Sequence, residues 1–174
     1  MLKLILIRHG ETQGNKLKRY IGKRTDEPLC PEAGNMLAQL AYPEVQAVYA
    51  SPMIRCTQTA GILFPGKKLN IIDELAECDF GEFENKNYQE LDGNEHYQSW
   101  IDSGGLLPFP GGESREEFKR RNVTGRICIF ITPGSHARIS GPFSIIQDQF
   151  PPHNLCHSAH ASHKKSGLRL HILP

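Results

Sequence analysis

The first 72 residues alternate between short apolar runs and longer segments of mixed polarity. Residues 2–7 are almost entirely apolar, which is typical of a strand buried on both faces of a parallel sheet. Two more runs of strand length lie at 45–50 and 69–72. Between the runs, the sequence predicts helices over 31–40 and 53–63, the first with a proline in its first turn. This order predicts an α/β fold, a three-layer α/β/α sandwich on a mostly parallel sheet.

The pattern changes after the third predicted strand. Residues 74–100 are acidic and aromatic, and glycines and prolines dominate 104–112. A helix is predicted over 113–121, with Ser114 as its cap and glutamate three residues later. The apolar run 127–131 is one more strand candidate, and the residues after it have weak periodicity.

Length and composition exclude several classes of protein. A chain of 174 residues is one domain, or one domain with a tail. Its apolar runs are too short to cross a membrane, and the first one is too short for a secretory signal. A net charge of +1 argues against binding nucleic acid through bulk charge. The five cysteines are scattered, which favours a reducing cytoplasm over a disulfide framework.

Charge divides the chain into two unequal parts. Residues 1–121 contain 15 basic and 18 acidic side chains, whereas residues 122–174 contain five basic residues and one acidic residue. The second part also holds six of the eight histidines. Such a shift usually marks a boundary or a tail, so we expect an α/β core over 1–121 and a divergent segment over 122–174.

Candidate chemistry follows each of the three predicted strands. Arg8-His9-Gly10-Glu11-Thr12 follows the first, and loops at the carboxyl ends of parallel strands are where ligands bind. Arginine offers a fork of donors to phosphate oxygens, and imidazole is a nucleophile near neutral pH. Ser51-Pro52 follows the second strand and places Arg55 in the first turn of a helix. Glu77 follows the third strand.

Together these motifs resemble those of the histidine phosphatase superfamily, the phosphoglycerate-mutase-like group that forms a phosphohistidine. The resemblance rests on Arg-His-Gly-Glu-Thr and Ser-Pro-x-x-Arg-x-x-Gln-Thr-Ala, and it covers about residues 2–121. It implies that His9 accepts the phosphoryl group, that Arg8 and Arg55 clamp its oxygens, and that Asn15 is a lesser phosphate contact. Glu77 would be the general acid. The resemblance implies no metal or cofactor, and a small phosphorylated metabolite as the partner.

Each of these roles has a structural alternative. Glu77 is chosen by the family spacing Leu-x-Glu-x-x-x-Gly, although an acidic stretch is usually a solvated face. Arg55 would otherwise cap a helix, and Asn15 would be a turn residue. Tyr97 and Trp100 are expected to pack beneath a lid rather than to form a substrate cage. The competing acidic residues are Glu74, Asp79, Glu82 and Glu84.

The family's second catalytic histidine, in a Ser/Thr-His-Gly segment, has no clear equivalent. Ser135-His136-Ala137 comes nearest but lacks the glycine. The histidines from His153 to His163 match nothing in the family, although such a run is also typical of a metal-binding tail. Two explanations stay open for 122–174: a natural divergent tail, or a change of reading frame. Because the second histidine is missing from its expected context, we expect a damaged or truncated phosphatase with weak or no activity.

Three functions therefore compete. The first is a phosphatase that acts on a small phosphomonoester through phospho-His9, closer to phosphatases such as α-ribazole phosphatase than to the longer mutases. The second is a non-catalytic binder of phosphorylated ligands, and the third is a phosphoglycerate mutase. The substrate and the oligomeric state are left open by the sequence.

Overall fold

The computed structural model describes residues 3–131, 142–146 and 170–173. Its centre is a five-stranded sheet with the order β3-β2-β4-β1-β5. The first four strands in that order are parallel, and β5 runs antiparallel to β1. The strands are β1 (Lys3–Ile7), β2 (Ala47–Ala50), β3 (Leu69–Ile71), β4 (Pro142–Ile146) and β5 (Leu170–Leu173).

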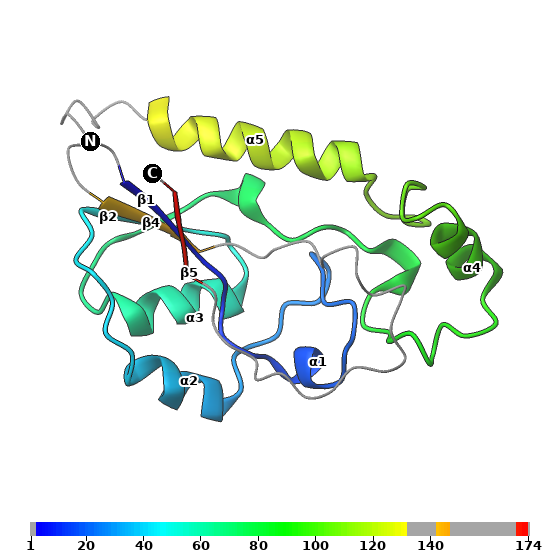
Figure 1. Cartoon of the computed structure of the whole chain (residues 1–174), viewed down its shortest axis with the longest axis horizontal. Coiled ribbons are helices and arrows are strands. Elements are labelled where there is room, and N and C mark those ends of the chain that lie inside the picture. Colours follow the sequence, from blue (N-terminus) through cyan, green and yellow to red (C-terminus); the bar gives the residue numbers. More distant parts are fainter. Residues whose placement is uncertain (1–2, 132–141, 147–169, 174) are drawn as a thin grey trace.

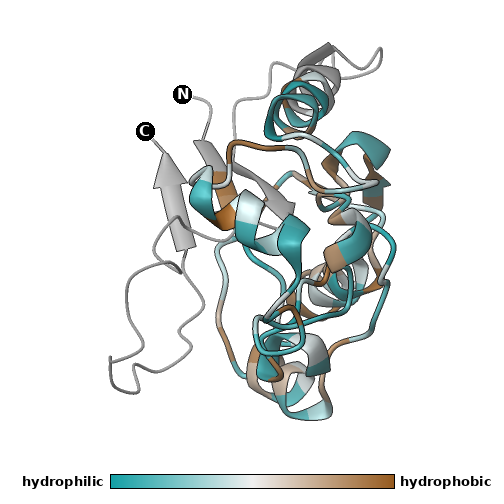
Figure 2. Cartoon of the chain, turned by 90° about the vertical axis from the view of Figure 1, so that its right-hand side faces the viewer, coloured by the Kyte–Doolittle hydropathy of each residue, from teal (hydrophilic) through white to brown (hydrophobic). Residues whose placement is uncertain are grey.

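Helices cover both faces of the sheet, which confirms the predicted three-layer α/β architecture. Helices α2 and α3 lie on one side and α5 lies on the other (Figure 1). The helices carry both hydrophilic and hydrophobic residues (Figure 2), which is typical of helices that bury one face and expose the other. The helices are α1 (Gln13–Lys16), α2 (Pro31–Ala38), α3 (Ile54–Leu63), α4 (Glu95–Asp102) and α5 (Arg115–Ile131), with 3₁₀ turns η1 (Asp73–Leu75) and η2 (Gly81–Phe83).

The main core lies between the sheet and α3. Ile5 and Ile7 of β1 and Val48 of β2 are almost completely buried, as the apolar strand pattern requires. Helix α3 contributes small side chains to the same cluster, including Cys56 and Ala60, both fully buried. Burial of this apolar surface fixes the start of α3, and with it Arg55, against the sheet.

A second, aromatic cluster supports the segment between η1 and α5. Its buried members are Cys78, Phe80, Phe83, Leu91, Phe109 and Phe118. Tyr97 and Trp100 of α4 pack against it, and their rings stack on each other at a centroid distance of 6.3 Å. These two residues therefore pack within the fold, as the sequence predicts.

The strand predicted over 127–131 is wrong. These residues end α5, a single helix of 17 residues. Ser114 begins it with the predicted capping interaction, because its hydroxyl accepts from the Glu117 amide at 3.2 Å and its amide donates to the Glu117 carboxylate at 2.9 Å. Helix extension from this capped start adds one backbone hydrogen bond per residue, whereas a short apolar run has no period that marks it as a strand.

The strand that follows α5 is β4, which lies between β2 and β1 and pairs with both. Helix α5 runs without a break through the boundary predicted after Arg121, and that boundary stays a prediction. His136 and the histidines from His153 to His163 lie outside the described residues. Among the described helices, none combines the length and apolar character that crossing a bilayer requires.

Candidate active site

His9 follows β1 directly and is buried, with 7% of its surface exposed. Its Nδ1 lies 2.5 Å from the carbonyl oxygen of Gly10. A carbonyl only accepts hydrogen bonds, so this contact requires a proton on Nδ1. In the neutral imidazole Nε2 is then unprotonated, and it is the nitrogen that can attack an electrophile.

One hydrogen bond joins the His9 loop to α3, and a second one within α3 extends the connection to Arg55. The amide of Gly10 donates to Thr59 Oγ1 at 3.0 Å, and the Thr59 hydroxyl donates to the carbonyl of Arg55 at 2.7 Å. Thr59 is fully buried. The sequence contained Thr59 within the Gln-Thr-Ala motif but gave no reason to assign it a separate role. The structure places it as the connection between the candidate nucleophile and the candidate phosphate ligand.

Arg55 is buried in the first turn of α3, with 1% of its surface exposed. Its Nη1 donates to the carbonyl of Thr25 at 3.2 Å, and its Nη2 lies 3.4 Å from the carbonyl of Ile21. A guanidinium is always charged, and at a helix N-terminus its charge adds to that of the helix dipole. Arg55 thus provides a fixed positive charge and also holds the loop 21–25.

Glu84 is a second support of the loop 21–25. One carboxylate oxygen accepts from the Gly22 amide at 3.0 Å and from the Thr25 hydroxyl at 2.8 Å. The other accepts from the amides of Arg24 at 3.2 Å and Phe80 at 3.3 Å. A Cβ at Gly22 would overlap this carboxylate and the Cys78 carbonyl, so the position requires glycine. Glu84, a competitor of Glu77 in the sequence, is therefore a structural residue.

We expect Glu84→Gln to lower the free energy of unfolding by about 2 kcal/mol, because an amide NH₂ would face backbone donors in place of one oxygen. Urea denaturation monitored by circular dichroism measures this loss. Glu82→Gln is the matched control, since the Glu82 side chain is 52% exposed and forms a surface ion pair with His96. Equal stability of the two variants would contradict the role of Glu84.

Glu77 follows η1 and is buried, with 5% of its surface exposed. Its Oε1 accepts from the Cys78 amide at 2.8 Å. The carbonyl of Cys78 accepts from the Lys23 amide at 2.9 Å, which joins the Glu77 segment to the same loop 21–25 that Arg55 holds. The loop therefore connects the candidate acid to the candidate phosphate ligand.

Cys78, beside Glu77, is fully buried. Burial raises the pKa of its thiol far above the ordinary value of 9.0, and the carboxylates of Glu113 and Glu77 raise it further. Arg121 lowers the pKa of this thiol, but by less than burial and the two carboxylates raise it, so the thiol is neutral at physiological pH.

We expect Cys78 to react with iodoacetamide at pH 8 at least about 100-fold more slowly in the folded protein than in urea, because the thiolate is the reactive form. Peptide mass spectrometry measures the two rates. The folded state favours the neutral thiol. The contribution of Cys78 to the free energy of unfolding is therefore complete below the ordinary pKa of the thiol, and it is lost as the pH rises above about 9. Equal rates in the two conditions would contradict the raised pKa.

The two remaining residues predicted to bind phosphate, Arg8 and Asn15, lie near His9 in the sequence. Arg8 is exposed, and the described part of the chain provides it with no hydrogen bond or ion pair. Asn15 is half-buried and completes a capping box on α1, because its Oδ1 accepts from the Thr12 amide at 3.1 Å. The turn role left open by the sequence is therefore present, and a phosphate contact by Asn15 would use its amide nitrogen.

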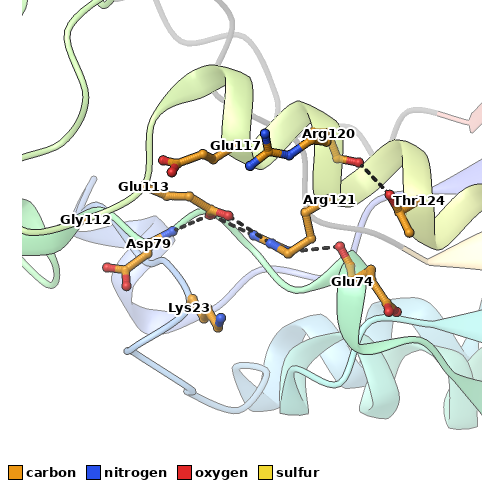
Figure 3. A pocket seen from close by; sticks show the side chains of 9 residues that line it. All are labelled: Lys23, Glu74, Asp79, Gly112, Glu113, Glu117, Arg120, Arg121 and Thr124. Atoms are coloured by element: carbon orange, nitrogen blue, oxygen red, sulfur yellow. Dashed lines mark hydrogen bonds and ion pairs between the residues drawn. The ribbon is translucent and has the colours of Figure 1, made fainter.

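A cavity of about 520 Å³ adjoins the Glu77 segment, and its lining includes none of the five predicted site residues. Figure 3 shows Arg121 of α5 beside the carboxylate of Glu113 in this cavity. The sequence places Glu113 at the start of the helix predicted over 113–121 and marks no role for Arg121. The lining residues are Lys23, Glu74, Asp79, Gly112, Glu113, Glu117, Arg120, Arg121 and Thr124.

Comparison with known proteins gives a consistent family. The sequence profile described as "Histidine phosphatase superfamily (branch 1)" matches residues 4–126. Phosphoserine phosphatase 1 from Hydrogenobacter thermophilus is 32% identical over 123 residues, which cover 66% of this chain and 57% of that protein. Bifunctional protein Rv2228c from Mycobacterium tuberculosis is 31% identical over 137 residues, covering 74% of this chain and 37% of that protein. The chain thus spans less than two thirds of either relative.

A solved structure shares the fold. The α-ribazole phosphatase from Shigella flexneri superposes with a TM-score of 0.70 at 26% sequence identity. The superposition covers 84% of this chain and 74% of the other.

Proposed function

Because the chain belongs to the histidine phosphatase superfamily, we propose that it hydrolyses a small phosphomonoester through a phosphohistidine at His9. The observation that carries this proposal is the set of hydrogen bonds from the His9 loop through Thr59 to Arg55. A buried imidazole with unprotonated Nε2 and a buried guanidinium are thereby held on one connected framework. Phosphoryl transfer depends mainly on such positioning and on charge stabilisation.

The proposed reaction has two steps. In the first, Nε2 of His9 attacks phosphorus, the bond to the leaving oxygen breaks, and Glu77 gives that oxygen a proton. In the second, water attacks phosphorus, Glu77 takes up a proton from the water, and the N–P bond breaks to release inorganic phosphate. Arg8 and Arg55, with a lesser contribution from Asn15, would bind the phosphoryl oxygens and stabilise their charge.

The substrate class follows from the same groups and from the relatives. Relatives include proteins named phosphoserine phosphatase and α-ribazole phosphatase, which supports a small phosphorylated metabolite. The scattered cysteines favour a reducing cytoplasm as the compartment in which the protein meets this substrate.

A second candidate function is non-catalytic binding of a phosphorylated ligand. It is favoured by one observation, that no Ser/Thr-His-Gly segment occurs anywhere in the sequence. We also propose that a change of reading frame in the gene produced residues 122–174, which therefore no longer follow the family sequence. The family match ends at residue 126, close to the change in charge after residue 121. Resequencing the gene around codon 122 tests the frame change. A second reading frame that encodes a Ser/Thr-His-Gly segment downstream would support it.

Trapping the phosphoenzyme tests the proposed function. The protein is mixed with a ³²P-labelled aryl phosphate and quenched in alkali, in which phosphohistidine is stable. Label that is lost in acid, together with release of inorganic phosphate, is the expected result. Label without turnover indicates a phosphoenzyme that water does not hydrolyse, whereas binding without label favours the non-catalytic binder. Product analysis with phosphoglycerate separates a phosphatase from a mutase.

A further inference from the structure

Arg121 of α5 contacts the backbone of the segment that ends at Glu77. Its Nη1 donates to the carbonyls of Glu74 at 2.8 Å and Ala76 at 2.9 Å. Its Nη2 donates to the carbonyl of Glu77 itself at 3.2 Å. Three carbonyls within four residues of the chain are therefore held by one guanidinium.

The other side of the same guanidinium binds Glu113. Arg121 Nε lies 2.9 Å from Glu113 Oε1, and Nη2 lies 2.8 Å from Oε2, so the ion pair is bidentate (Figure 3). Glu113 in turn accepts from the Asp79 amide at 3.2 Å, and its own amide donates to the Asp79 carbonyl at 2.9 Å. The backbone on both sides of Glu77 is thus bound, through Arg121 before it and through Glu113 after it.

This pair has the burial that a rigid support needs. The side chains of Arg121 and Glu113 are 19% and 16% exposed, and the guanidinium carbon lies 5.3 Å from the centre of the Phe118 ring. Such a pair is screened less by solvent than a surface ion pair. Five contacts from one planar group cannot be reproduced by lysine, which has a single ammonium with three donors.

We infer that Arg121, together with Glu113, is a positioning residue that fixes the Glu77 carboxyl for proton transfer to the leaving oxygen. Arg121 acts through the backbone and does not touch the reacting atoms. This inference rests on the proposed function, because it assigns to Arg121 the alignment of a group that the proposed reaction requires. An error of about 1 Å in that alignment is enough to slow a reaction by about 100-fold.

Substrates with different leaving groups test the inference. The p-nitrophenolate ion leaves without much help from an acid, whereas the alkoxide of glycerol 3-phosphate requires a proton. For Arg121→Gln, we expect phosphoenzyme formation in a single turnover to slow by about 100-fold with glycerol 3-phosphate, and by less than about 5-fold with p-nitrophenyl phosphate. Arg121→Lys should also lose more rate with glycerol 3-phosphate than with p-nitrophenyl phosphate, but to a smaller extent. Because it keeps the positive charge, it can be used if Arg121→Gln does not fold.

Arg120→Gln is the matched control. Arg120 lines the same cavity on the same helix, but it makes none of the contacts to the Glu77 segment. We expect its two rates to match those of the wild-type protein. An equal loss with both substrates in the Arg121 variants, or no loss, would overturn the inference.

Amide hydrogen exchange keeps this test separate from the proposed function. The Cys78 amide donates to the Glu77 carboxylate and the Asp79 amide donates to Glu113, so both report on the alignment. We expect both to exchange at least about 10-fold faster in Arg121→Lys than in the wild-type protein. A wild-type protein that forms no phosphoenzyme would contradict the proposed function. In that case the exchange rates of these two amides still test whether Arg121 holds the Glu77 segment. Unchanged rates in Arg121→Lys would overturn that role.

Discussion

Replacing His9 with alanine should abolish phosphoenzyme formation and reduce turnover of an aryl phosphate by at least about 1,000-fold, as loss of a nucleophile does in other enzymes. The reason is that no other described side chain is buried, has an unprotonated nitrogen and lies in a loop that is hydrogen-bonded through Thr59 to Arg55. Incorporation of ³²P after an alkaline quench measures the first effect, and release of inorganic phosphate measures the second.

His96→Ala is the control for this experiment. His96 lies on α4, its side chain is 64% exposed, and among the described residues it pairs with Glu82 alone. We expect wild-type labelling in that variant. Vanadate binding by His9→Ala should persist in weakened form, because both arginines remain. Phosphate label that survives in His9→Ala would assign the nucleophile to another residue and contradict the proposed function.

Arg55→Ala should weaken vanadate binding by about 100-fold, which corresponds to about 3 kcal/mol, because it removes a charged, bidentate donor from the proposed phosphate site. It should also lower the free energy of unfolding by about 2 to 4 kcal/mol, since the carbonyls of Thr25 and Ile21 lose a buried donor. Calorimetric titration with vanadate measures the first effect, and urea denaturation measures the second.

Two further variants separate binding from folding in the Arg55 experiment. Arg55→Lys keeps the charge and loses the planar fork, so its binding and stability should both be intermediate. Asn15→Ala removes one of the two hydrogen bonds of the α1 capping box and the proposed lesser phosphate contact, and it should weaken vanadate binding less than Arg55→Ala does. Unchanged vanadate binding in both Arg55→Ala and Asn15→Ala would remove Arg55 from the site.

The parallel core could be predicted because its signals are local. An apolar run such as 2–7 and a proline at the start of a helix act within a few residues, and β1 and α2 have the predicted character. The capping of α5 by Ser114 is equally local. The strand predicted over 127–131 is wrong because five apolar residues fit a strand or the end of a helix equally well, and only the continuation of α5 decides between them.

The candidate site divides in the same way. Arg8, His9 and Arg55 are marked in the sequence because each follows a strand within a short motif, and the chemistry of phosphate requires those residue types. The sequence does not mark Glu84 or Arg121, because each acts on backbone groups about 44 to 62 residues away along the chain.

The amino-acid sequence by itself determined the class of fold and the kind of chemistry, since strand periodicity and the residue types around a phosphate are properties of short segments. Only the tertiary structure decided which acidic residue supports the loop 21–25 and which arginine holds the Glu77 segment. Acidic and basic side chains look alike in a sequence. Their roles differ once folding buries some of them against backbone donors and acceptors and leaves the others in water.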